Sequence, residues 1–336
     1  MADLKGKKIL LIANRGYSEQ IKNDLTVEGA QVVHINDKPN DGFFAKSLGR
    51  LYVKPYVSLV LEKYYAREIE KKRDADFDYI LSIRGEYTPV ESLKQLRKAF
   101  PRAKIILYMW DSMKNNRKVE ARWPFYDTVW TFDRQDYLKH RDELRFLPLF
   151  YCENILPAEE EKPVYDLSFI GTGHGDRVAI AKEIARQCEQ SGLSFFSYLY
   201  VPHVLVYCYN KLLNPDYRHV KISDVHFQRM NLQEVYRIYK QSRCVLDVES
   251  ATQSGLTMRT VEILGLKRKL MTTNPEIRNY DFFNSDDFAV FNRKKPQIDP
   301  TFIASPFVPL PAEIYKRYSL KSWLETIFAD GENTIS

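Results

Sequence analysis

The chain has 336 residues, of which 44% are apolar and 13% aromatic, which is enough material for two buried cores at roughly 150 residues per domain. Its formal net charge is +6, and the basic residues are dispersed, so the composition argues against a nucleic-acid-binding protein. A charge of this size is compatible with an anionic small ligand or with a loose hold on an anionic membrane.

The spacing of the cysteines and the hydropathy of the chain limit the kinds of protein that it can be. The four cysteines, Cys152, Cys188, Cys208 and Cys244, are widely separated and form no Cys-x-x-Cys pair. This pattern argues against a zinc site or a disulfide scaffold and suits a reducing cytosol. No apolar run approaches the ~20 residues that span a bilayer. We therefore expect a cytoplasmic protein without a signal peptide.

Strands and helices alternate in the N-terminal part of the chain. Ser18 is placed to cap the first helix and Gly29 to end it, while Asp133 is placed to cap the helix that follows the fifth strand. The predicted strands are 7–13, 31–35, 77–82, 104–109, 128–132 and 145–149, and the predicted helices are 19–28, 57–72, 90–99 and 134–140. This alternation predicts a doubly wound parallel α/β sheet of the Rossmann type.

Three loops of this first part follow predicted strands directly. They cover residues 14–18, 84–89 and 110–115. Because the carboxyl ends of parallel strands share one edge of a sheet, we expect the three loops to line one cleft. Only Gly16 stands where a dinucleotide fingerprint needs three spaced glycines, so the opening is not a dinucleotide site.

A second α/β alternation follows an acidic, proline-bracketed linker at 157–163. Its predicted strands are 165–170, 193–200, 245–248 and 269–273, and its predicted helices are 178–191, 235–241 and 258–266, with one or two more within 311–328. We therefore assign 1–156 to one Rossmann-like domain, 163–310 to a second, and 311–336 to C-terminal helices.

Residues 201–231 do not fit this alternation. The stretch is apolar and aromatic around 202–213 and carries basic residues on its flanks. Two interpretations stay open: an inserted helical hairpin that packs on its own domain, and a helix that lies on a membrane surface.

A glycine-rich loop opens the second domain, at Gly171-Thr172-Gly173-His174-Gly175-Asp176-Arg177. Glycines allow close backbone approach, so that N–H groups can surround a phosphate. Arg177, at the start of a helix, would add a charge-assisted partner. The alternatives are a plain tight turn for the glycines and a solvent-exposed position for His174.

A second polar loop runs into the helix 258–266. Arg259 lies in the first turn of this helix and Glu262 one turn later, so the two side chains share a face. Arg259 can pair with a phosphate at the helix N-terminus, and Glu262 can accept bonds from a ribose or sugar hydroxyl. The competing interpretation is an ordinary βαβ unit with an Arg–Glu surface pair.

This second loop carries a family resemblance. The stretch Gln253-Ser254-Gly255-Leu256-Thr257-Met258-Arg259-Thr260-x-Glu262, followed by a strand that ends in Thr272-Thr273-Asn274, resembles the nucleotide-sugar site of bacterial GT-B glycosyltransferases. Within that superfamily the spore-maturation-like and polysaccharide-biosynthesis enzymes are the most similar. The chain departs from better-known members because Ser254 stands where they have the first glutamate of a Glu-x7-Glu pair.

The resemblance implies a GT-B fold, with two Rossmann-like domains that face a cleft and C-terminal helices that cross back to the first domain. It implies a hexosyl-type glycosyltransferase that uses a nucleotide-sugar donor to build bacterial surface polysaccharide, such as lipopolysaccharide, capsule or exopolysaccharide. The donor-binding residues expected from the two loops are Gly171, Thr172, Gly173, His174, Arg177, Thr252, Gln253, Ser254, Gly255, Leu256, Thr257, Arg259, Thr260 and Glu262.

An inverting transfer needs a base for the acceptor hydroxyl. Asp111, directly after a buried strand, is the first candidate, and Glu86 is the second. Helix capping or pairing with an arginine is the alternative for Asp111. The acceptor-side residues expected with them are Asn14, Arg15, Arg84 and Trp110.

We expect no metal and no cofactor, because no Asp-x-Asp motif follows an early strand. The acidic run Asp74-x-Asp76-x-Asp78 precedes its strand and has the character of a solvated turn. The expected partners are a nucleotide-sugar donor and a glycan or lipid-linked acceptor, with a peripheral contact at the inner face of the cytoplasmic membrane and no nucleic acid. The competing functions are a non-catalytic two-lobed nucleotide- or sugar-binding protein and a GT-B epimerase.

Overall fold

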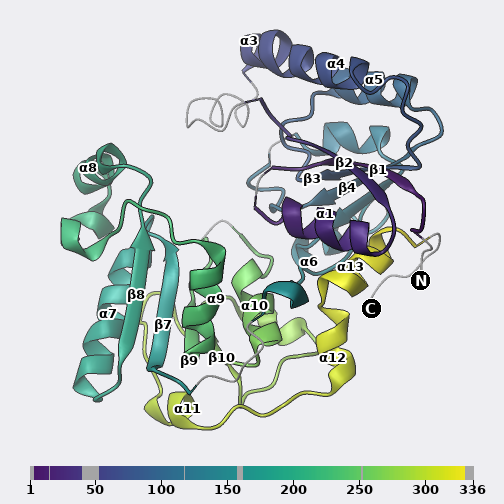
Figure 1. Cartoon of the computed structure of the whole chain (residues 1–336). Coiled ribbons are helices and arrows are strands. Elements are labelled where there is room, and N and C mark those ends of the chain that lie inside the picture. The colour runs from purple at the N-terminus through teal and green to yellow at the C-terminus, as the bar shows by residue number, and fades with distance from the viewer. Residues whose placement is uncertain are drawn as a thin grey trace. The chain divides into compact units, whose positions relative to one another are not determined.

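The computed structural model describes residues 4–14, 16–39, 53–116, 118–156, 162–250 and 253–329 (Figure 1). Among the predicted features, Arg15, Thr252 and most of the linker at 157–163 lie outside these ranges. The chain forms two compact units. The first comprises Met1–Leu149, Thr252–Gly255 and Leu320–Ser336, and the second comprises Phe150–Ala251 and Leu256–Ser319. Each unit is described here by itself.

The first unit is built on a six-stranded parallel sheet with the order β2-β1-β3-β4-β5-β6. Its strands are β1 (Lys8–Ile12), β2 (Gln31–Ile35), β3 (Tyr79–Ile83), β4 (Lys104–Met109), β5 (Thr128–Thr131) and β6 (Arg145–Phe146). The direction of winding reverses between β1 and β3, and ligands of open α/β sheets bind beyond the carboxyl ends of the strands at such a switch point. The loops after β1, β3 and β4 therefore meet at one edge of this sheet.

Helices cover both faces of the first sheet, with α4 and α5 on one face and α1 and α13 on the other (Figure 1). The helical segments are α1 (Ser18–Val27), α3 (Lys54–Tyr56), a π-helical turn (Val57–Leu61), α4 (Glu62–Glu70), α5 (Val90–Ala99), a 3-10 turn (Glu120–Phe125), α6 (Arg134–Lys139) and α13 (Leu320–Ile327). The C-terminal helix α13 belongs to this unit: its Trp323 ring packs edge-on against Tyr108 at 4.7 Å.

Capping predictions for this unit had mixed outcomes. Asp133 accepts a bond from the backbone N–H of Gln135 at 3.0 Å, which confirms it as the cap of α6. Gly29 follows α1 with a φ of +88°, the left-handed conformation that glycine adopts without strain. The prediction for Ser18 was wrong. Helix α1 begins at Ser18 itself, and within the described part of the chain the buried Ser18 hydroxyl makes no capping bond.

The second unit is built on a five-stranded parallel sheet with the order β11-β10-β9-β7-β8. Its strands are β7 (Tyr165–Thr172), β8 (Phe195–Tyr200), β9 (Ser242–Asp247), β10 (Lys269–Thr272) and β11 (Phe288–Val290). The short edge strand β11 was not predicted. Strand β7 runs two residues further than predicted, so Gly171 and Thr172 lie in the strand and the loop before the next helix is correspondingly shorter.

Helix α7 covers one face of the second sheet, and α9 and α10 cover the other (Figure 1). The helices are α7 (Arg177–Gln190), α8 (Val204–Leu213), α9 (Leu232–Lys240), α10 (Met258–Leu266), α11 (Pro300–Ala304) and α12 (Ala312–Arg317), with 3-10 turns at Glu153–Ile155, Pro215–Tyr217, Ile222–Asp224 and Pro275–Asn279. The buried core of this unit includes Leu167 and Phe169 of β7 and Ile184 of α7. The predicted α/β class, with two Rossmann-like units, is confirmed.

Candidate functional site

The loop between β7 and α7 is held tightly by its own backbone. The Gly173 N–H donates to the Tyr200 carbonyl at 2.8 Å, and the His174 N–H donates to the Thr172 carbonyl at 3.0 Å. A side chain at Gly173 would press on Tyr217 Oη and Val201 at 3.2 Å. A side chain here would therefore need Tyr217 and Val201 to shift, and the amides of Gly173 and His174 are already engaged within the protein.

Arg177 begins helix α7, whose N-terminal residue Asp176 makes no side-chain capping bond. The half-buried guanidinium donates from Nη1 to Thr172 Oγ1 at 2.7 Å and lies 3.2 Å from His174 Nε2, while its Nε has no hydrogen-bond partner among the described residues. Burial, together with the positive charge of Arg259, lowers the pKa of Arg177 to about 10. The same two causes, burial and the charge of Arg177, lower the pKa of His174. A cation in this position gains from a bound anion.

Arg259, in the first turn of α10, is held by protein groups. Its Nε donates to Tyr239 Oη at 2.8 Å, its Nη1 to Asp247 Oδ1 at 2.6 Å, and its Nη2 to the Ile170 carbonyl. Burial opposes the charge of this guanidinium, but the Tyr239 oxygen and the Asp247 carboxylate outweigh burial and raise its pKa. Arg259 thus borders the end of β7, beside Gly171, with most of its bonding capacity used.

Asp247, at the end of β9, is fully buried and gathers the start of α10 around it. It accepts bonds from Thr257 Oγ1 at 3.0 Å and Thr260 Oγ1 at 3.3 Å as well as from Arg259. Thr257 also caps α10. Glu262, one turn along the same helix, is 5% exposed. The predicted donor residues of α10 therefore lie together, but largely as an internal network.

Arg293, beyond β11, completes a group of three arginines and was missed from the sequence. It binds Asp176 bidentately, from Nε at 2.7 Å and Nη2 at 2.6 Å, and its Nη1 lies 3.1 Å from Glu249 Oε1. Burial raises the pKa of Glu249, whose other oxygen accepts a bond from Thr273. A basic residue just after a short strand was the available signal, but that strand was not recognised.

The three arginines differ in how their charges are balanced. Arg259 is paired with Asp247, and Arg293 is paired with Asp176 and Glu249. Within the described ranges, Arg177 has no carboxylate within ion-pair distance. The charges of Arg259 and Arg293 both act on Arg177, which places the three groups in one electrostatic neighbourhood. Arg177 is therefore the cation of this group that is open to an external anion.

The loop 253–255 belongs to the first unit, although its neighbours in sequence belong to the second. Ser254 Oγ donates to Asp133 Oδ2 at 2.7 Å, and the Gly255 N–H donates to the same oxygen at 2.9 Å. Gln253 Nε2 donates to the Gly255 carbonyl at 3.1 Å, and the next residue, Leu256, is buried. Asp133 therefore binds the hydroxyl of Ser254 and the backbone N–H of Gly255, two residues that were predicted to bind the sugar donor.

At the carboxyl edge of the first sheet, Arg84 follows β3 and links the two predicted catalytic carboxylates. Its Nη2 forms an ion pair with Asp111 Oδ2 and lies 3.9 Å from Glu86 Oε2. Arg84 has a φ of +76° and Gly85 a φ of +62°. A positive φ is costly for a non-glycine residue and is typical of functional sites. Although burial opposes it, the Asp111 and Glu86 charges raise the pKa of Arg84.

The other acceptor-side residues lie in neighbouring loops of this edge. Trp110, after β4, stacks on Tyr17 at 5.8 Å between ring centroids and packs edge-on against Tyr108. Asn14 follows β1, the strand next to β3 in the sheet. The structure therefore places Asn14, Arg84, Glu86 and the Trp110-Asp111 pair at the same edge of the first sheet, as the sequence predicted.

A buried ion pair at the same edge was missed. After β2, Lys38 Nζ lies 3.0 Å from Asp37 Oδ1, and both side chains are almost fully buried. Lys38 also lies 4.5 Å above the Tyr87 ring, and burial raises the pKa of Asp37. Burying a pair of opposite charges is a weak source of stability. Its position just past a predicted strand was the only sequence signal.

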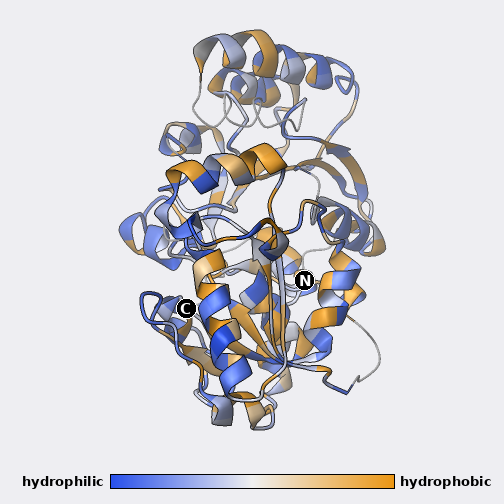
Figure 2. Cartoon of the chain, turned by 90° about the vertical axis from the view of Figure 1, so that its left-hand side faces the viewer, coloured by the Kyte–Doolittle hydropathy of each residue, from blue (hydrophilic) through white to orange (hydrophobic). Residues whose placement is uncertain are grey.

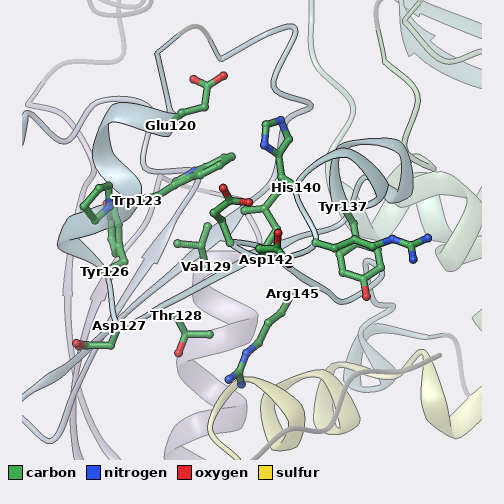
Figure 3. Close-up of a pocket in the computed structure, with 14 residues that line it drawn as sticks. Glu120, Trp123, Tyr126, Asp127, Thr128, Val129, Tyr137, His140, Asp142 and Arg145 are labelled. Carbon is green, nitrogen blue, oxygen red and sulfur yellow. The ribbon is translucent and has the colours of Figure 1, made fainter.

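A pocket of about 920 Å³ lies in the first unit near the start of β5 (Figure 3). Trp123 and His140 pack edge-on in its wall, with ring centroids 5.3 Å apart. Thr128 and Val129, which line it, are the first residues of β5, so the pocket lies near the amino ends of the strands. None of the residues that line it is a predicted site residue. The pocket is therefore not part of the candidate site.

Two further observations concern only the residues that the structure describes. The described residues include no group of three or more His, Cys, Asp or Glu side chains placed to hold a metal ion. None of their helices is long and apolar enough to cross a membrane.

No protein-family model matches the chain, and no curated protein matches it in sequence. Solved structures do match in fold. A trehalose-6-phosphate synthase is 10% identical, with a TM-score of 0.55 and coverage of 96% of this chain and 95% of that chain. The catalytic domain of starch synthase IV from Arabidopsis thaliana, bound to ADP and acarbose, is 9% identical, with a TM-score of 0.52 and coverage of 96% and 94%. A UDP-N-acetylglucosamine 2-epimerase is 11% identical, with a TM-score of 0.50 and coverage of 96% and 94%.

These similarities extend over nearly the whole length of the chain. Together with the two parallel sheets they define the class: this is an α/β protein of the GT-B fold, with two Rossmann-like units. At these identities the likeness establishes the fold and no more.

Proposed function

We propose that the protein is a glycosyltransferase that moves a sugar from a nucleotide-sugar donor to a glycan or lipid-linked acceptor in bacterial surface polysaccharide biosynthesis. One observation carries the proposal. Arg177 lies half-buried at the start of α7, with no carboxylate partner among the described residues, beside two further arginines. Helix N-termini with a nearby arginine favour phosphate groups. The GT-B proteins that share the fold include a starch synthase that binds ADP.

In this proposal the second unit binds the donor. The diphosphate lies near the N-terminus of α7 and is bound by Arg177, while Arg259 and Arg293 add positive charge from their paired positions. As the bond between the sugar and the diphosphate breaks, negative charge grows on the leaving nucleoside diphosphate, and fixed cations stabilise it. Because side chains supply this charge, the proposed transfer is metal-independent and needs no cofactor.

The first unit supplies the acceptor side. The acceptor hydroxyl oxygen attacks the anomeric carbon, and its proton passes to a carboxylate, for which Asp111 is the first candidate and Glu86 the second. Arg84 donates a hydrogen bond to Asp111 and lies 3.9 Å from Glu86. Asn14 and Trp110 extend the same edge toward the acceptor.

The proposal also covers location. A lipid-linked acceptor is presented at the inner face of the cytoplasmic membrane, and the protein is cytoplasmic with peripheral contact there. The donor sugar is hexosyl in this proposal, in keeping with the family that the 253–262 stretch resembles.

Thermal unfolding with a panel of UDP, GDP, dTDP and CMP sugars tests donor binding, because a bound ligand raises the unfolding temperature by mass action. Slow hydrolysis of the stabilising nucleotide sugar without acceptor would show that the protein is an enzyme and not a binding protein. Conversion of that sugar to its epimer would identify an epimerase instead. Stabilisation by none of these donors would contradict the proposal.

A further inference from the structure

Helix α8 presents its apolar side to the outside. The exposed fractions are 69% for Leu205, 63% for Tyr209 and 83% for Leu212, residues that follow one another at helical spacing. Figure 2 shows this helix on the face turned to the viewer, coloured mostly as hydrophobic. A surface helix normally directs its apolar side to the core. Exposed apolar patches of this kind mark interaction surfaces.

The inner side of α8 is fixed to the protein, with Tyr207 buried in the core of the second unit and Val206 packed against that core. Lys211 Nζ donates to the carbonyls of Arg218 and Val220, each at 2.7 Å, and Tyr207 Oη donates to the Val220 carbonyl at 2.9 Å. These bonds hold the helix in this orientation without help from the exposed leucines. The orientation of α8 is therefore built into the fold, and the leucines on its outer side are available to a partner.

Basic side chains accompany the exposed leucines. Arg218, Lys221 and Arg229 are exposed in the segment that follows α8. Of the two acidic residues in that segment, Asp224 is paired with Lys182 at 2.8 Å. Asp216 is the other. Residues 214–229 therefore follow the apolar helix with a formal net charge of +1, from three Arg or Lys against two Asp.

We infer that α8 and the basic segment 214–229 form a docking surface for an anionic lipid bilayer. A helix with leucine and aromatic side chains on its outer side and Lys or Arg nearby lies in the interface between headgroups and acyl chains. Anionic headgroups attract the basic residues. A second copy of this chain would bring an equally positive segment and repel them. The bilayer is the occupant that satisfies both features. Only the purpose of this contact, access to a lipid-linked acceptor, rests on the proposed function.

Flotation of the full chain with vesicles tests the inference without donor or acceptor. The protein should float with vesicles that contain phosphatidylglycerol and remain behind with phosphatidylcholine alone. Leu212→Glu should weaken binding by tenfold or more, because a charge replaces an apolar side chain that the bilayer buries. Val27→Glu is the matched control, since Val27 is also 83% exposed but lies on α1 of the first unit, and it should bind like the wild type. Lys221→Glu should weaken binding and reduce its salt dependence.

Two outcomes would overturn the inference. One is unchanged flotation of Leu212→Glu. The other is a wild-type dimer in analytical ultracentrifugation that Leu212→Glu dissociates while neither protein floats, which would assign α8 to a second copy. Donor-induced stabilisation measured on the same samples checks that the variants are folded. It also separates failure of the membrane contact from failure of the proposed transferase.

Discussion

Replacing Arg177 with glutamine should weaken donor binding while leaving the protein as stable as before or more stable. The pKa of about 10 means that the folded protein disfavours the charged guanidinium by roughly 3 kcal/mol relative to water. Water still reaches the half-buried side chain, and the variant loses the bond to Thr172, so we expect a net gain in unfolding free energy of about 1 kcal/mol. At neutral pH the arginine is protonated in both folded and unfolded states, so this unfavourable term is fully present.

Donor binding should change in the opposite direction. A charge-assisted hydrogen bond contributes about 1.5–3 kcal/mol, so Arg177→Gln should raise the dissociation constant of a nucleotide sugar roughly 10- to 100-fold. Urea unfolding without ligand measures stability, and isothermal titration with the donor identified in the thermal panel measures affinity. A stabilised variant with weak binding is the signature of a cation placed for a ligand and not for the fold.

Two matched arginines serve as controls. Arg293→Gln leaves Asp176 and Glu249 without their cation and should destabilise the protein by about 2–3 kcal/mol. Arg186→Gln, on the exposed side of the same helix α7, should change neither stability nor affinity. Unchanged donor affinity in Arg177→Gln, or a loss of several kcal/mol in its stability, would refute the assignment of Arg177 to the ligand.

Four further predictions address chemistry and packing. Asp111→Asn should abolish transfer in a radiolabelled-sugar assay while titration shows normal donor binding; full activity would exclude this base and would suit a retaining mechanism, which needs none. Incubation with chelator should leave the transfer rate unchanged, and strict dependence on an added divalent ion would contradict side-chain stabilisation of the diphosphate. Gly265→Ala should destabilise by about 1–3 kcal/mol in urea unfolding, because a Cβ there would lie 2.5 Å from the Tyr151 ring, and this clash exceeds the gain of about 1 kcal/mol in helix propensity. Because burial and the charge of Arg177 lower the pKa of His174, its ring should gain a proton only as the pH falls below the usual histidine range; that protonation should tighten donor binding severalfold, and His174→Gln should abolish the change.

Local patterns predicted the elements well where the signals lie within one turn or one strand. The predicted bounds of α5 and α10 match the structure, because apolar periodicity and flanking residues determine where such helices begin and end. Strands β2 and β4 match for the same reason. The three-residue β11 was missed because so short a segment shows no periodicity. The fold class followed from the order of elements and needed no tertiary information.

The candidate site was predicted only as far as sequence neighbours define it. The Gly loop and Arg177 are adjacent in the chain, and so are the threonines and Arg259 that surround Asp247. Arg293 could not be found in this way, since its partner Asp176 is 117 residues distant. The bond between Ser254 and Asp133 spans 121 residues and depends on the chain entering the first unit for only a few residues. Such pairings arise from the tertiary fold and leave no local pattern.

The carboxylates at the ends of the strands differ in how many hydrogen bonds they accept. An ionised carboxylate offers about four acceptor positions. Asp133 accepts from Ser112, Ser254 and the N–H groups of Gly255 and Gln135, so its positions are used to hold loops together. A buried polar group needs hydrogen-bond partners, so these donors stabilise Asp133 in the core.

Asp247 likewise accepts several hydrogen bonds, from Arg259 and from the hydroxyl groups of Thr257, Thr260 and Thr272. Among the residues that the structure describes, Asp111 accepts a hydrogen bond from Arg84 alone, and its side chain is 24% exposed. A base must have a free lone pair and access to the acceptor hydroxyl. Asp133, Asp247 and Asp111 all follow buried strands. The number of hydrogen bonds that each carboxylate accepts excludes Asp133 and Asp247 as bases and favours Asp111.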